Sequence, residues 1–270
     1  MKIIILAKRD LASNLALNQL LPRLAGEHEL RVFLSSQVGS TSVLPDSLRL
    51  LKFFEQTLFN DILFPAMDGG APGTGYRSFN QLSQFTVSPV TLLNRINTEQ
   101  GLATLNACEP DLVICIRYGA ILKEQAIAIP RLGVINLHSG ILPDYRGVMA
   151  TFRALMNSEE EIGATLHYIS DASIDTGDII ATTRMGVVAS HSYLWHVLQL
   201  YPAACKRLLH TIEQLSAGQT PNCRPQSPGG HYYSFPTQSV LDDFSRCGRK
   251  LFDVDEISEI TAQYCGPGTI

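Results

Sequence analysis

Short apolar runs alternate along this chain with segments of helical periodicity, and this alternation leaves few folds open. Residues 2–7 and 30–34 flank a stretch with leucines at helical spacing that closes at Gly26, which predicts a β-α-β unit with a right-handed crossover. Residues 111–116 and 133–137 are nearly continuous apolar runs, as expected for strands covered by helices on both faces. The pattern predicts an α/β protein with an open, mostly parallel, Rossmann-like sheet.

Other segments fill in this architecture. Helical stretches are expected near residues 45–60, 79–84 and 98–107, and a short strand at 90–93. Residues 68–75 are too rich in Gly and Pro for regular structure and predict a surface loop. A less favoured alternative is that this loop serves as a lid over a ligand site. Residues 163–169 and 178–183 predict two neighbouring strands.

The character of the chain changes beyond residue 190. Apolar residues recur at steps of three and four from Leu194 to Leu215 and stop before Gly218, which predicts one long amphipathic helix. Residues 231–237 suggest a strand and turn that lead to a short closing helix. We therefore expect a catalytic domain over residues 1–190 and a small C-terminal helical and β extension over residues 191–270.

Composition removes several classes of function. The 270 residues carry a formal net charge of −4 with only 17% charged residues, which argues against an extended basic surface for nucleic acid. The N-terminal apolar run is too short for a signal peptide, and polar residues interrupt the uncharged stretch 185–205, so we expect a cytoplasmic protein without a membrane span. Six scattered cysteines without a Cys-x-x-Cys pair predict neither a disulfide framework nor a metal site. Residues 7–12 lack the Gly-x-Gly-x-x-Gly of dinucleotide oxidoreductases.

Reactive side chains follow the strand at residues 133–137. Ligands of open α/β sheets bind beyond the carboxyl ends of the strands. Asn136 and His138 are two positions apart, so both side chains face the same side of an extended strand end. An amide donor beside an imidazole suits acyl transfer, and Asp175 in a later loop would orient the imidazole or a water molecule. The alternative is that Asn136 and His138 only satisfy backbone groups at a strand end.

The surrounding motifs carry a family resemblance. The segments Asn136-Leu137-His138, Ile141-Leu142-Pro143, Tyr145-Arg146-Gly147 and Asp175-Thr176-Gly177-Asp178 resemble the signature of the folate-dependent formyltransferases, and the resemblance is dense over roughly residues 105–185. This family includes methionyl-tRNA, glycinamide ribonucleotide and amino-sugar N-formyltransferases.

The resemblance implies transfer of a formyl group from N10-formyltetrahydrofolate to a primary amine, without a metal. It implies that Asn136, His138 and Asp175 are catalytic. It also implies a pterin pocket lined largely by backbone groups of two segments, represented here by Tyr118, Ala120, Ile121, Leu122, Ser170, Asp171 and Ala172. Ser139-Gly140 departs from the family's usual Pro-Ser or Gly-Ser, which we expect to affect only the local turn.

The amine acceptor is narrowed by elimination. Methionyl-tRNA formyltransferases carry an additional C-terminal domain with a basic surface. Few residues follow position 190 here and the net charge is negative, so tRNA is disfavoured as a partner. Ala12-Ser13-Asn14 lacks the glycine of a phosphate-binding helix start, and Ser13 or Asn14 is expected as a helix N-cap. By this elimination and by the family resemblance of the Arg146-Gly147 pattern, we expect a small-molecule acceptor, either a nucleotide-linked amino sugar or an amino acid-like precursor. Residues 232–235 could stack on an acceptor ring or close a core.

Three alternative functions remain open. Water could replace the amine in a formyltetrahydrofolate hydrolase, although we expect such enzymes to carry an N-terminal regulatory domain. A methionyl-tRNA formyltransferase without its usual C-terminal domain is the second alternative. A non-catalytic module that binds a folate or nucleotide is the third. The sequence leaves the oligomeric state open, with a homodimer among the options.

Overall fold

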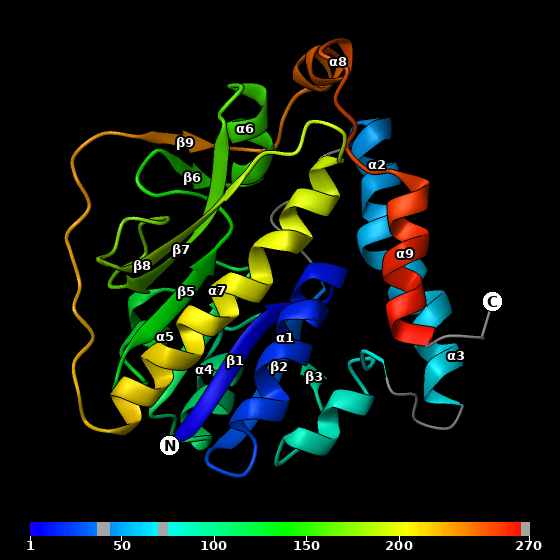
Figure 1. Cartoon of the computed structure of the whole chain (residues 1–270). Helices are drawn as coiled ribbons and strands as arrows, with labels where there is room; N and C mark the ends of the chain where they lie inside the picture. The colour runs from blue at the N-terminus through cyan, green and yellow to red at the C-terminus, as the bar shows by residue number, and fades with distance from the viewer. Residues whose placement is uncertain (37–43, 70–74, 266–270) are drawn as a thin grey trace.

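The computed structural model describes residues 1–36, 44–69 and 75–265, and its centre is a seven-stranded sheet (Figure 1). The strand order is β3-β2-β1-β4-β5-β7-β8. β3, β2, β1, β4 and β5 run parallel to one another, and β7 pairs in antiparallel with both β5 and β8. The strands are β1 (Lys2–Lys8), β2 (Glu29–Ser35), β3 (Thr91–Leu92), β4 (Leu112–Ile116), β5 (Val134–His138), β7 (Glu161–Ile169) and β8 (Ile179–Gly186). The predicted open, mostly parallel α/β sheet is confirmed.

Helices cover the sheet on both faces. α1 (Leu11–Leu24) and α7 (Tyr193–Ser216) share one hydrophobic cluster with β1, and α4 (Glu99–Ala107) and α5 (Glu124–Ile127) contribute to the cluster on the other face. Every residue of β4 is buried, which explains its continuous apolar run. The central strands thus have no solvent-facing side, and chemistry is confined to their ends.

The start of α1 differs from the sequence-based expectation. The N-cap is Asp10, not Ser13 or Asn14, because the Asp10 side chain accepts a hydrogen bond of 2.9 Å from the Ser13 backbone N–H. Asp10 is fully buried, and its other carboxylate oxygen lies 2.8 Å from Arg117 Nε, just beyond β4. The helix therefore begins one turn earlier than we expected. Asp10 is preferred over Ser13 as the N-cap because its carboxylate also pairs with Arg117.

The expected helix near residues 45–60 is longer and changes its winding. It comprises α2 (Asp46–Lys52), a π-helical stretch η1 (Phe53–Leu63) and α3 (Phe64–Asp68), and a 3₁₀ helix η2 (Gln81–Phe85) follows in the chain. Phe59 and Phe64 pack against Tyr264 of α9 (Val254–Cys265), with ring centroids 5.5 Å apart in both pairs. The expected loop at 68–75 lies largely outside the described residues.

The C-terminal part returns to the carboxyl edge of the sheet. After α7 the chain runs along the β8 side of the sheet (Figure 1) and forms β9 (His231–Tyr233), which pairs in parallel with β6 (Tyr145–Gly147) beside α6 (Ala150–Met156). Two helices follow instead of the single one expected, α8 (Gln238–Arg246) and α9. The domain boundary at residue 190 stays a prediction. Among the described residues, no helix has the length and apolar character needed to span a membrane.

Candidate active site

The carboxyl end of β5 gathers the residues singled out in the sequence. Asn136 pairs with His167 across the antiparallel β5–β7 ladder, and His138 is the last residue of β5. Asp175 arrives from the loop between β7 and β8, with its backbone in the left-handed region at φ 55°. Strand pairing and one strained loop residue therefore bring Asn136, His138 and Asp175 together.

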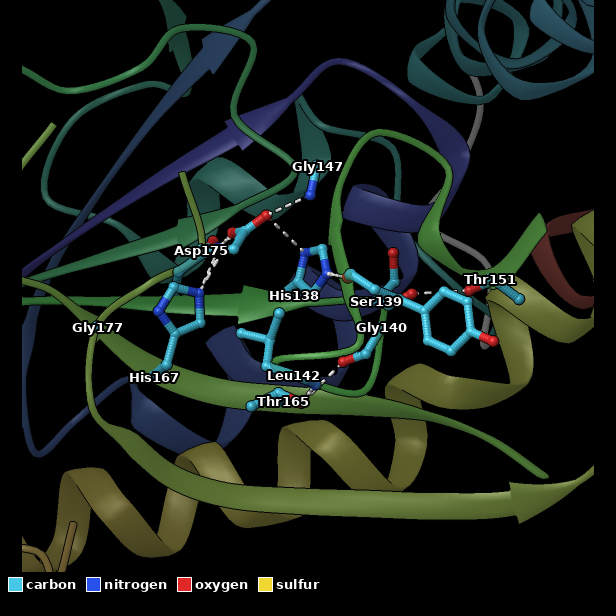
Figure 2. A network of polar contacts seen from close by, with 12 residues as sticks. His138, Ser139, Gly140, Leu142, Gly147, Thr151, Thr165, His167, Asp175 and Gly177 are labelled. Carbon is cyan, nitrogen blue, oxygen red and sulfur yellow. Dashed lines mark hydrogen bonds and ion pairs between the residues drawn. The ribbon is translucent and has the colours of Figure 1, made fainter. Parts of the chain in front are cut away.

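Asp175 lies at the centre of this group (Figure 2). Its Oδ2 lies 3.5 Å from His138 Nδ1 and accepts a 2.8 Å hydrogen bond from the Gly147 backbone N–H. Its Oδ1 lies 3.4 Å from His167 Nε2 and accepts a 3.2 Å bond from Asn136 Nδ2. One carboxylate thus contacts two imidazoles, an amide and a backbone donor.

This environment keeps the Asp175 carboxyl ionised. Burial by itself raises the pKa of Asp175, because it disfavours the charged form. The opposing effects include the charge of His138 and the hydrogen bond from the Gly147 N–H, and the pKa is held well below its usual range. The site therefore contains a buried, fixed negative charge.

His138 is held on both sides of its ring. Its Nε2 donates a 2.7 Å hydrogen bond to the backbone carbonyl of Tyr145, while Nδ1 faces Asp175. Both neighbours are hydrogen-bond acceptors, so contacts at both nitrogens fix the orientation of the ring. The side chain is only 8% exposed, so water contributes little to its hydrogen bonding.

His167 was missed in the sequence. Its Nδ1 donates to the Tyr168 carbonyl at 2.9 Å, and this contact leaves Nε2 as the acceptor for Asn136 Nδ2 at 3.1 Å. The two hydrogens of the Asn136 amide are thereby directed to His167 and Asp175. The signal available in the sequence was that His167 lies in the predicted strand at residues 163–169, immediately before the Asp175 loop.

Gly140 affects the packing of His138 as well as the local turn. A Cβ atom at this position would lie 2.6 Å from His138 Nε2, 2.5 Å from Ala150 Cβ and 2.8 Å from the Tyr145 carbonyl oxygen. The Ser139-Gly140 departure from the family pattern therefore concerns the packing of His138 as well as the turn, which corrects our expectation. The missing side chain leaves the imidazole close to the loop backbone.

Two threonines fix the loop that follows His138. Thr165 Oγ1 donates to the Gly140 carbonyl at 2.7 Å and accepts from the Leu142 N–H at 3.2 Å (Figure 2). Thr151 Oγ1 donates to the Ser139 carbonyl at 2.8 Å. These bonds satisfy buried backbone groups that have no partner in a strand or helix.

The residues expected at a pterin pocket lie in two loops, one after β4 and one after β7. Tyr118 and Ala120 follow β4 and pack on the α4–α5 face of the sheet together with Ile169. Leu122 is buried, whereas Ile121 is 55% exposed. Ser170, Asp171 and Ala172 follow β7, where the Asp171 carboxylate accepts a 2.7 Å bond from the Ser173 N–H.

The loop after β4 is anchored by its backbone. The Gly119 N–H donates to Ser35 Oγ at 2.8 Å, and the Lys123 N–H donates to Asn97 Oδ1 at 2.9 Å. No cluster of three or more His, Cys, Asp or Glu side chains with metal-binding geometry occurs in the described part of the chain.

Comparison with known proteins bears on this site. Residues 69–194 match the family model described as formyl transferase. Methionyl-tRNA formyltransferase of Kosmotoga olearia is 33% identical over 131 residues, which cover 48% of this chain and 42% of the relative. The enzyme of the same name from Acidothermus cellulolyticus is 32% identical over 169 residues, or 63% of this chain and 51% of the relative. The matched region thus spans about half the length of these relatives.

Solved structures share the fold at low sequence identity. The sugar 3N-formyl transferase WlaRD, crystallised with dTDP and 5-N-formyl-THF, has a TM-score of 0.57 at 16% identity, covering 86% of this chain and 69% of that one. Glycinamide ribonucleotide transformylase 1 of Symbiobacterium toebii has a TM-score of 0.57 at 15% identity, covering 84% and 95%. The resemblance noted in the sequence is confirmed, because residues 69–194, which contain the cluster around Asp175, match the formyl transferase family model.

Proposed function

We propose that this chain transfers the formyl group of N10-formyltetrahydrofolate to the primary amine of a small-molecule acceptor. The observation that carries the proposal is the convergence of Asn136, His138 and Asp175 at the carboxyl end of β5, inside the segment matched by the formyl transferase family. The donor carries the formyl carbon on N10. The bond between this carbon and N10 breaks during transfer, and N10 departs with the tetrahydrofolate.

The chain's residues account for the charge and proton changes of this reaction. When an amine attacks the formyl carbon, negative charge develops on the formyl oxygen, and a protonated His138 ring beside it stabilises that charge. The attacking nitrogen must lose a proton and N10 must gain one. His138 can exchange them once Nε2 turns away from the Tyr145 carbonyl, because the ring can then give its Nε2 proton to N10 and take up the proton of the attacking nitrogen. Asp175 orients the ring through Nδ1 and stabilises its charged form.

Asn136 is the second group in this scheme that can stabilise the negative charge on the formyl oxygen. In the structure both Nδ2 hydrogens are directed to protein groups, His167 at 3.1 Å and Asp175 at 3.2 Å. To act as an oxyanion donor, the amide would redirect one hydrogen from these partners to the formyl oxygen. Until then the same contacts keep the side chain beside the reacting position, which reduces the entropic cost of orientation.

The loops beside the cluster suit a flat ring. The exposed Ile121 side chain, beside the apolar packing of Tyr118 and Ala120, offers apolar surface, and the backbone of residues 170–172 offers polar groups at the start of the Asp175 loop. Because Ser35 and Asn97 already anchor the loop after β4, its backbone is preorganised for a ligand. These features support the folate as donor.

For the acceptor we propose a nucleotide-linked amino sugar, with an amino acid-like amine as the alternative. Tyr232 is 54% exposed, and its ring lies against Gly147, whose N–H holds Asp175. A ring exposed so close to the reacting groups can stack on a nucleobase. The N-terminus of α1 is meanwhile occupied by the buried Asp10 carboxylate, which disfavours an acceptor phosphate at that position.

The test is a panel of amines incubated with N10-formyltetrahydrofolate, with release of tetrahydrofolate and formylated product both measured. The panel contains nucleotide-linked amino sugars, amino acids, glycinamide ribonucleotide and methionyl-tRNA. Transfer to one amine class with little release in its absence supports the proposal. Fast release without any amine would instead identify a hydrolase, and binding of the folate without turnover in any mixture would leave only a binding module.

Variants of the catalytic group sharpen this test. His138→Ala and Asp175→Ala should retain the fold and lose formyl transfer by roughly 10²–10⁴-fold, the range expected for a general acid–base group. The matched control is His210→Ala, since His210 is an exposed histidine on α7 whose nearest acidic partner is Glu213. Transfer that survives His138→Ala at wild-type rates would refute the assigned role.

A further inference from the structure

The segment that follows α7 is fastened to the catalytic edge at several points. We call residues 224–233 the strap. At one end Arg224 and Ile179 exchange backbone hydrogen bonds of 2.9 and 2.8 Å at the start of β8. At the other end β9 pairs with β6, and the Val148 N–H donates to the Tyr233 carbonyl at 2.8 Å. The strap lies outside residues 69–194, the region matched by the family model.

Gln226 connects the strap to the catalytic loop. Its Nε2 donates to the backbone carbonyl of Asp175 at 2.9 Å and to that of Gly177 at 2.7 Å. Both hydrogens of this amide are therefore used, and each holds a carbonyl of the turn that presents the carboxylate. The side chain is half-buried, so water competes only in part for the two carbonyls.

The turn at Asp175 needs such support. Asp175 has φ 55°, a left-handed conformation that a residue with a side chain keeps only where the surroundings impose it. Gly177 packs so closely that a Cβ there would lie 1.8 Å from the Tyr168 carbonyl oxygen. Gln226 bridges these two positions, and the strap also holds β6, whose Gly147 N–H binds the Asp175 carboxylate.

We propose that Gln226 is a positioning residue for Asp175, and that the strap thereby completes the active site. The inference rests on the proposed function. Gln226 holds the Asp175 main chain, while β9 holds the Gly147 donor on the opposite side of the carboxylate. Removing the Gln226 donors lets the 175–177 turn relax, which lengthens the contacts of the carboxylate with His138 and Gly147.

The experiment compares Gln226→Met, which keeps the length of the side chain and removes both donors, with Gln226→Ala. The control is Gln219→Ala, an exposed glutamine that precedes the strap. The first readout uses N10-formyltetrahydrofolate and the best amine from the panel. Gln226→Met should lower kcat by about tenfold, corresponding to about 1.4 kcal/mol of transition-state stabilisation, and leave KM for the folate within about twofold.

The second readout needs no substrate. Hydrogen exchange of the Gly147 amide in the full chain should accelerate by about tenfold or more in Gln226→Met and stay unchanged in Gln219→Ala, because the amide loses its carboxylate acceptor. Unchanged exchange overturns the inference, and so does faster exchange with wild-type kcat. If the wild-type chain transfers formyl to no amine, the proposed function fails separately, and exchange alone decides whether Gln226 positions Asp175. Gln226→Ala serves if Gln226→Met does not fold.

Discussion

Substitution of Gly140 by alanine tests whether the packing around His138 sets the geometry of the site. The added Cβ would meet the Ala150 Cβ at 2.5 Å, His138 Nε2 at 2.6 Å and the Tyr145 carbonyl oxygen at 2.8 Å. Gly140 does not have a positive φ, so alanine adds no backbone strain and the effect is steric. Ala150 is buried at the start of α6, so the imidazole is the neighbour with most freedom to move.

The expected size of the effects on stability and kcat follows from the short distances between the added Cβ and its neighbours. Inserting one methyl group into a closely packed position costs typically 1–3 kcal/mol. For a chain of this size, a loss of about 2 kcal/mol lowers Tm by roughly 4–8 °C. Displacing the His138 ring by about 1 Å breaks its 2.7 Å bond to the Tyr145 carbonyl and lowers kcat by about 10²-fold.

The assay combines thermal unfolding with formyl transfer to the amine identified in the panel. Gly186→Ala is the matched control, because Gly186 has an ordinary φ and nothing lies within 4 Å of the position of its added Cβ. The control should keep wild-type Tm and kcat. If Gly140→Ala behaves like Gly186→Ala, the loop adapts without moving His138, and the reasoning from packing is refuted.

Three further predictions concern the buried polar groups. His167→Ala removes the acceptor of Asn136 and a neighbour of Asp175, so kcat should fall about tenfold or more while the folate still binds, as measured by titration with 5-formyltetrahydrofolate. The folded-state pKa of Asp175 is lowered, so its stabilising contribution is present above the unfolded pKa of about 3.9 and is lost as pH falls toward the folded value. Urea unfolding should therefore show the stability gap between wild type and Asp175→Asn narrowing below about pH 4, and a constant gap would contradict the assignment. Asp10→Asn keeps an N-cap acceptor for Ser13 but leaves the half-buried Arg117 with Glu55 as its remaining carboxylate partner among the described residues, and it should cost about 3 kcal/mol of unfolding free energy without loss of folate binding.

Local pattern was sufficient for the sheet and for much of the site. Continuous apolar runs can be satisfied only as strands covered on both faces, so β1, β4 and β5 were predictable without knowledge of their partners. Asn136 and His138 were found because strand geometry places residues two apart on one side. Asp175 came from the family motif.

Contacts between residues that are distant in the chain were not predicted from the sequence. Asp10 replaced the expected Ser13 as N-cap because it pairs with Arg117, 107 residues later. His167 joined the site through the register of β5 with β7, and no short-range pattern encodes that register. The number of helices after the strap was also misjudged, since α9 is held by aromatic contacts with η1 and α3.

The sequence by itself determined the class of fold and indicated a candidate site at the end of one strand with three candidate side chains, because periodicity and motif are properties of neighbouring residues. Only the tertiary structure decided how those side chains are held. Asp175 keeps its charge because His138 and the Gly147 N–H face it, His138 fits because Gly140 has no side chain, and Gln226 reaches the 175–177 turn from a segment 51 residues away. Burial, close packing and strand register depend on the whole chain folding at once, so none of these features can be assigned to a local motif.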